Sequence, residues 1–84
     1  MMMRVRVLFF AALRERVRRS EAEWTLPDGA TVADLWEAVA AAHPDVEPLA
    51  SSMSFAVNQE YAAREHALRD GDEVALIPPV SGGC

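Results

Sequence analysis

The chain has 84 residues, a length that suits one domain with a small core. Hydrophobic residues make up 51% of it and charged residues 25%, which indicates a globular rather than a disordered protein. The formal net charge of -5 argues against nucleic acid as the main partner, because phosphate contacts need a cationic surface. No transmembrane helix and no secretory signal are expected, and the cytoplasm is the predicted location.

The chain opens on a predicted strand over residues 4–10, where side chains alternate between the two faces. The residues expected to face the core are Val5, Val7 and Phe9. The opposite face would carry Leu8 and Phe10 beside Arg6, which leaves two apolar side chains only partly covered.

Residues 11–19 are predicted to form a short helix, because Leu13 and Val17 lie four apart and share one face. Four arginines occupy much of the remaining helix surface: Arg14, Arg16, Arg18 and Arg19. Such a cluster is typical of a solvated helix face, and docking against an acidic patch is the alternative.

A second strand is predicted over residues 23–26, followed by the main helix of the domain. Thr31 is the expected N-cap, with Asp34 three residues later completing a capping box. The helix should end near His43, because Pro44 disfavours helical geometry in the residue before it. The apolar stripe that would face the core is Val32, Leu35, Trp36 and Val39.

The last third of the chain is predicted to be a loop over residues 45–52 and then strands. Residues 53–58 alternate as a strand, Asn58-Gln59 forms a hairpin turn, and Asp70-Gly71 forms a tight turn. The final strand covers residues 73–77, with Val74 and Leu76 inward and Ala75 and Ile77 outward. This order predicts an α+β fold, a mixed sheet with its main helix packed across one face and the last strand beside the first.

The single cysteine excludes an intrachain disulfide framework, and His43 and His66 lack metal-ligand spacing, so no metal site is expected. The chain ends in Gly82-Gly83-Cys84. Glycine lacks a Cβ, so this ending suits a thin thread that enters a narrow channel and presents a glycyl carbonyl for activation. The sequence therefore suggests a carrier whose working group is its own C-terminus.

Nearly the whole chain resembles the MoaD family, the small subunits of molybdopterin synthase. The segments that carry the resemblance are residues 5–15, 56–61 and 68–83. The last is the most specific, because Asp-Gly-Asp-Glu-Val leads into Pro-Pro-Val-Ser-Gly-Gly.

The resemblance implies a ubiquitin-like β-grasp domain over residues 1–80 and a C-terminal tail over residues 81–84. It implies a sulfur carrier that is not catalytic alone and binds no cofactor. An ATP-dependent activating enzyme would adenylate Gly83, and the adenylate would become a thiocarboxylate. Gly82 would be the second residue without a side chain in the narrow C-terminal tail. In the large synthase subunit, the sulfur would pass to cyclic pyranopterin monophosphate during molybdenum cofactor biosynthesis.

The expected partner-binding surface combines outward apolar residues with the residues that lead to the tail. Its members are Leu8, Phe10, Ala75, Ile77, Pro78, Pro79, Val80 and Ser81. The alternative is that these are ordinary, partly exposed apolar residues that need no partner.

Cys84 departs from the family pattern, which ends at Gly-Gly. The favoured explanation is that a protease removes Cys84. The alternatives are a neutral or non-native addition, a persulfide at Cys84, or a residue that disables the usual chemistry. Persulfide chemistry ranks lowest, because no basic or helix-end environment that would activate the thiol is evident.

Three other functions remain open from the sequence. The first is a sulfur carrier for thiamine synthesis or tRNA thiolation. The second is a protein modifier joined through Gly83 to target lysines. The third is a β-grasp binding module whose tail is inert.

Overall fold

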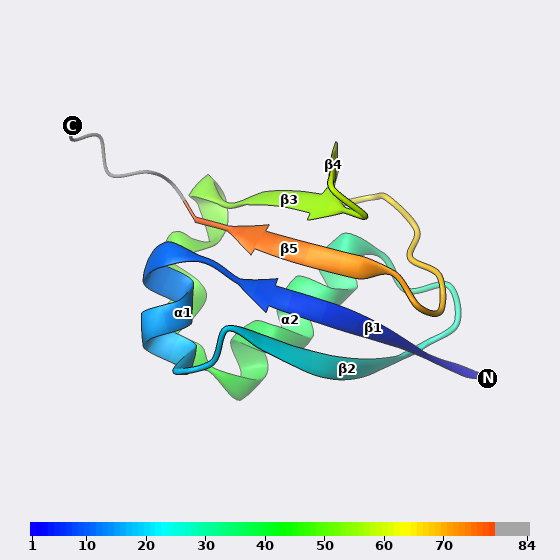
Figure 1. Cartoon of the computed structure of the whole chain (residues 1–84), viewed down its shortest axis with the longest axis horizontal. Coiled ribbons are helices and arrows are strands. Elements are labelled where there is room, and N and C mark those ends of the chain that lie inside the picture. The colour runs from blue at the N-terminus through cyan, green and yellow to red at the C-terminus, as the bar shows by residue number, and fades with distance from the viewer. Residues whose placement is uncertain (79–84) are drawn as a thin grey trace.

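Two adjacent inner strands of the sheet come from opposite ends of the chain (Figure 1). In the computed structural model, which describes residues 1–78, β1 (Met2–Phe9) pairs in parallel with β5 (Glu73–Ile77). Antiparallel strands extend the sheet on both sides, in the order β2-β1-β5-β3-β4. Their bounds are Glu21–Pro27 for β2, Ser54–Val57 for β3 and Glu60–Ala62 for β4.

The main helix, α2 (Val32–Ala42), crosses one face of this sheet (Figure 1). Its predicted capping box is confirmed: Thr31 Oγ1 accepts from the Asp34 N–H at 3.3 Å, and Asp34 Oδ2 accepts from the Thr31 N–H at 2.9 Å. The last helical residue is Ala42, and His43 is the C-cap immediately before Pro44, as expected. The predicted α+β class, with a mixed sheet and one helix across it, is therefore confirmed.

The core lies between α2 and the sheet face that it covers. Trp36 of α2 meets Phe55 of β3 edge to face, with ring centroids 6.1 Å apart. The predicted inward residues are all buried: Val5, Val7, Phe9, Val32, Leu35, Val39, Val74 and Leu76. Fully burying one such side chain contributes about 1.5–3 kcal/mol, so this set is the main source of stability.

Several predicted boundaries are wrong by one or two residues. β1 starts at Met2 rather than residue 4, and Phe10 leaves the strand to become the N-cap of α1 (Ala11–Val17). That helix stops two residues early because Arg18 adopts φ 66°, and its N–H donates to the Arg14 carbonyl. β2 is longer than expected because β1 pairs with it from Glu21 to Pro27.

The predicted loop over residues 45–52 is wrong, because the chain there forms the 3₁₀ helix η1 (Pro44–Ser52). Val46 anchors η1 in the core. The guanidinium of Arg16 donates to the Asp45 carbonyl, and that of Arg64 donates to the Ala50 carbonyl. Side chains from outside the segment therefore supply hydrogen-bond donors to two carbonyls of η1. This explains why the sequence of η1 itself shows no helical periodicity.

The two predicted turns are confirmed. Asn58 and Gln59 have φ of 52° and 74°, the left-handed pair required by a two-residue hairpin between β3 and β4. Gly71 has φ 88°, a conformation that glycine adopts without a Cβ penalty. Among the helices in residues 1–78, none has the length and apolar character needed to cross a bilayer.

Candidate functional site

The sheet face opposite α2 carries an apolar depression of about 370 Å³ next to the end of β5. The structure brings together four of the predicted partner-binding residues in its lining: Leu8, Phe10, Ala75 and Ile77. Successive side chains of a strand point to opposite faces. Leu8, Ala75 and Ile77 therefore point away from α2, while their neighbours Val7, Val74 and Leu76 fill the core.

Strand register explains the concave shape of this apolar depression. Leu8 pairs with Ala75, Ala75 with Ala56, and Ala56 with Tyr61, so these four residues form one row across β1, β5, β3 and β4. The two middle members are alanines and the outer two are large. The row is therefore low at its centre and high at its ends. Phe10 and Tyr61 are 44% and 80% exposed, which leaves a large apolar area open to a partner.

Sequence reasoning missed Ala56 and Tyr61 as members of this face. They belong to β3 and β4, and only the register across the Asn58-Gln59 turn brings them opposite Ala75. A two-residue hairpin turn fixes that register, so the turn signal could have located Tyr61.

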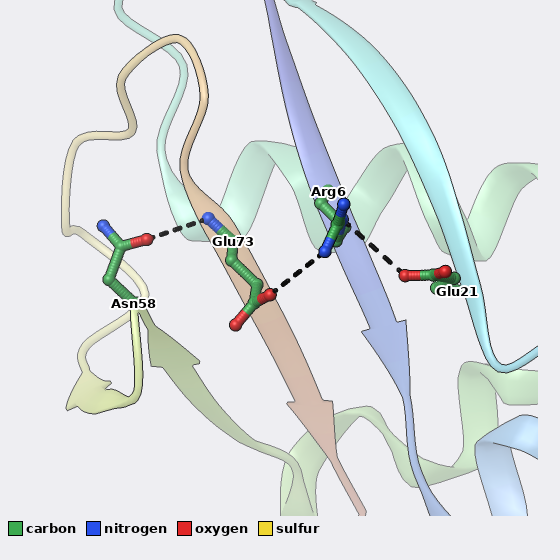
Figure 2. A network of polar contacts seen from close by, with 4 residues as sticks. All are labelled: Arg6, Glu21, Asn58 and Glu73. Atoms are coloured by element: carbon green, nitrogen blue, oxygen red, sulfur yellow. Dashed lines mark hydrogen bonds and ion pairs between the residues drawn. The ribbon is translucent and has the colours of Figure 1, made fainter.

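A line of charges borders the apolar depression. Figure 2 shows Arg6 between Glu21 and Glu73, with nitrogen–oxygen distances of 3.6 Å to each. Glu73 also lines the depression, and its N–H donates to Asn58 Oδ1 at 3.1 Å. Arg6 is 63% exposed. Exposed pairs of this kind are typically worth 0–1 kcal/mol, so they define the border of the face more than they stabilise the fold.

The end of β5 adjoins the apolar depression, because Ile77 is both its last strand residue and part of the lining. Pro78 follows and is buried. The remaining predicted site residues lie outside the described part of the chain: Pro79, Val80, Ser81, Gly82, Gly83 and Cys84. The domain boundary at residue 80 and the roles of the two glycines therefore stay predictions.

A larger polar depression of about 600 Å³ lies near the start of β5. Asp72 is part of its lining, and both carboxylate oxygens of Asp72 already accept hydrogen bonds, from the Asn58 side chain at 3.0 Å and the Arg69 N–H at 2.8 Å. These hydrogen bonds connect the Asn58-Gln59 turn to the Asp70-Gly71 turn, so the polar side chains of this region have a structural role. Within residues 1–78, no three His, Cys, Asp or Glu side chains are placed to share a metal ion.

The predicted basic cluster divides into two parts. Arg16 is committed to the Asp45 carbonyl of η1, which ties α1 to the main body of the domain. The other three arginines are exposed: Arg14, Arg18 and Arg19. Because α1 starts directly after Phe10 and contacts β5, this exposed basic surface lies at the end of the sheet where β5 finishes (Figure 1).

Comparison with known sequences places this geometry in a family. The profile of the ThiS family matches residues 7–83. A molybdopterin synthase sulfur carrier subunit from Chlamydomonas reinhardtii is 46% identical over 83 residues, covering 96% of this chain and 100% of that protein. The subunit of the same name from Escherichia coli is 43% identical over 82 residues, covering 94% and 99%.

Comparison with solved structures agrees. SAMP1 from Haloferax volcanii superposes with a TM-score of 0.85 at 33% identity, covering 95% of this chain and 99% of that one. A ubiquitin from Caldiarchaeum subterraneum gives a TM-score of 0.66 at 18% identity over 99% and 100% of the two chains, which shows a shared fold. The expected resemblance is confirmed, and the chain belongs to the ThiS family, with a ubiquitin-like β-grasp fold.

Proposed function

We propose that this chain is the sulfur-carrier subunit of a molybdopterin synthase. The observation that carries the proposal is near full-length identity of 46% and 43% to two proteins of that name. The open apolar depression supports it, because it provides a docking surface directly beside the strand that leads to Gly83.

The proposed reaction uses the carboxyl group of Gly83 after Cys84 has been removed. A partner enzyme joins that carboxylate to AMP, which is a good leaving group, so the Gly83 carboxyl changes from a poor acyl donor into a good one. Sulfide sulfur then replaces AMP and leaves a thiocarboxylate. Tethering the sulfur to a docked domain raises its effective concentration at the pterin acceptor. ATP belongs to the activating partner, and this chain supplies the cosubstrate.

A hetero-oligomer is the proposed working form. A related structure, from Amycolatopsis orientalis, is the BexX/CysO complex and superposes with a TM-score of 0.72 at 25% identity. By analogy, the large synthase subunit would cover the apolar depression and receive Gly82-Gly83. The activating enzyme and the cytoplasmic location are parts of the same proposal.

Protein modification is a second candidate with its own support. A small archaeal modifier protein 1 from Haloferax volcanii superposes with a TM-score of 0.84 at 31% identity. A modifier and a sulfur carrier would share Gly83 activation and differ in the acceptor, which is a lysine amine in one case and a pterin in the other.

The decisive experiment is the intact mass of the protein isolated from its native host, followed by a sulfur-transfer assay with the large subunit. Loss of Cys84 with one oxygen replaced by sulfur is the expected mass. Gly83→Ala on the processed chain should abolish pterin sulfuration while the domain stays folded. Full-length mass with an unmodified carboxylate would instead favour an inert-tailed binding module, and mass shifts of other proteins would favour the modifier.

A further inference from the structure

The chain contains no lysine. All eight of its basic residues are arginine, and its one cysteine is Cys84. Residues 1–83 therefore carry no side-chain amine or thiol that could capture an acyl group and keep it. The remaining amine is the Met1 amino group, which is ion-paired with Asp28 at 3.6 Å. If Gly83 is activated as proposed above, its own domain therefore offers very few groups that could form a stable bond with the Gly83 acyl group.

The fold also separates the Met1 amine from the activated carbonyl. Phe9 pairs with Leu76 in the parallel β1–β5 ladder, so the start of β1 lies at the opposite end of the molecule from the end of β5 (Figure 1). Eight residues of strand separate Met1 from Phe9, a distance of about 27 Å. The five residues that follow Pro78 and end at Gly83 span at most about 17 Å when fully extended. An activated Gly83 therefore cannot reach its own amino terminus.

Two of the three exposed arginines of the basic cluster lie next to the end of β1, the strand that pairs with β5. The Arg14 N–H donates to the Phe10 carbonyl at 3.4 Å, one helical turn beyond the end of β1. Arg19 precedes Ser20, whose carbonyl accepts from the Phe9 N–H at 2.9 Å. Both residues are exposed at the end of the sheet where β5 finishes. A protonated guanidinium is a poor nucleophile, whereas a lysine amine is a usable one.

We infer that arginine in place of lysine around the end of β5 protects the activated Gly83 from acylating its own domain. The inference rests on the proposed activation of Gly83. With lysine at position 14 or 19, Nζ would attack the Gly83 carbonyl carbon and form a C–N bond. The bond from that carbon to AMP would break, AMP would leave, and the amine would lose a proton to solvent. The product would be a closed loop with no free carboxylate to carry sulfur.

The test uses residues 1–83 joined at Gly83 to a small thiol as a thioester, which retains every residue of the described fold. Arg14→Lys and Arg19→Lys are compared with the wild-type chain and with Arg4→Lys. Arg4 lies five residues before Phe9, about 17 Å back along β1, so only a fully extended segment could reach an amine there. Intact mass separates the products, because the self-acylated chain is one water lighter than the hydrolysed acid.

The expected result is hydrolysis alone for the wild-type chain and mainly self-acylation for Arg14→Lys and Arg19→Lys. Arg4→Lys should self-acylate at least tenfold more slowly than either. Capture by Met1 in the wild-type chain, or hydrolysis alone in both position 14 and position 19 variants, would overturn the inference. The assay contains no partner enzyme, so that failure would leave the sulfur-carrier proposal untouched. Failure of an activating enzyme to adenylate Gly83 would, conversely, leave this measurement unchanged.

Discussion

At the scale of single residues, Asn58 connects the β3–β4 hairpin to the start of β5. Its φ of 52° is left-handed, its Oδ1 accepts from the Glu73 N–H at 3.1 Å, and its Nδ2 donates to Asp72 at 3.0 Å. Asn58→Ala removes both side-chain bonds and leaves a residue that tolerates this φ less well. We expect the free energy of unfolding to fall by about 1–2 kcal/mol, measured by urea denaturation.

The neighbouring residue gives a control of opposite sign. Gln59 has φ 74° and makes no side-chain hydrogen bond within the described residues, so Gln59→Gly relieves backbone strain without removing a contact of that kind. The same urea experiment should show a gain of roughly 0.5–1 kcal/mol. If Gln59→Gly destabilised the protein as much as Asn58→Ala, the left-handed turn would not be the source of either effect.

At the scale of secondary-structure elements, the start of α2 depends on one hydroxyl. Thr31 Oγ1 accepts from the Asp34 N–H, which would otherwise be an unpaired donor of the first turn. Thr31→Ala should lower the free energy of unfolding by about 1 kcal/mol, measured by thermal or urea denaturation. Thr31→Ser keeps the acceptor and should cost much less. Equal losses for both variants would mean that the threonine methyl group, and not the cap, matters.

The apolar face spanning β1, β5, β3 and β4 makes a separate prediction about binding. Ile77 is half-buried at the end of β5, so Ile77→Asp places a charge inside the apolar depression. Affinity for the large synthase subunit should fall at least tenfold, a loss of about 1.4 kcal/mol, measured by titration calorimetry.

Thr25→Asp is the matched control for Ile77→Asp. Thr25 is exposed on β2 and pairs in register with Arg4, away from the apolar depression. It should leave affinity within twofold, with both variants keeping the circular dichroism of the parent. Unchanged affinity for Ile77→Asp would show that the partner binds another face.

At the scale of the whole molecule, the sequence predicted the parts of the fold that depend on local signals. The capping box at Thr31, the Asn58-Gln59 turn and the alternation in β1 and β5 are each complete within a few residues. The 3₁₀ helix η1 was missed because two of its carbonyls, those of Asp45 and Ala50, accept from Arg16 and Arg64, which lie outside the segment. Intrinsic helix propensity describes only the local preference of each residue, whereas these hydrogen bonds exist only after the tertiary fold has formed.

The residues of the candidate site divide in the same way, into those that local sequence signals predict and those that depend on tertiary contacts. Leu8, Ala75 and Ile77 could be assigned to the open face because each sits in a strand with clear alternation. Ala56 and Tyr61 could not, because their place beside Ala75 depends on the register of two further strand pairs. A concave surface is a property of strand neighbours, and the row of large, small, small and large side chains becomes visible only across four strands.

Stability of the whole domain should not depend on its last four residues. β5 is central, lies between β1 and β3, and buries Val74 and Leu76 completely, so the sheet is complete by Ile77. A chain that ends at Val80 should unfold within about 0.5 kcal/mol of the full chain in urea.

Leu76→Ala provides the contrast, because the cavity that it leaves in the core should cost about 2–5 kcal/mol. A loss above about 1 kcal/mol on removing residues 81–84 would mean that part of this segment packs on the domain. The segment would then have to detach before Gly83 could enter a partner, and the free energy of detachment would lower the affinity for that partner. Equal stability of the two chains would leave Gly83 available for activation without any prior unfolding step.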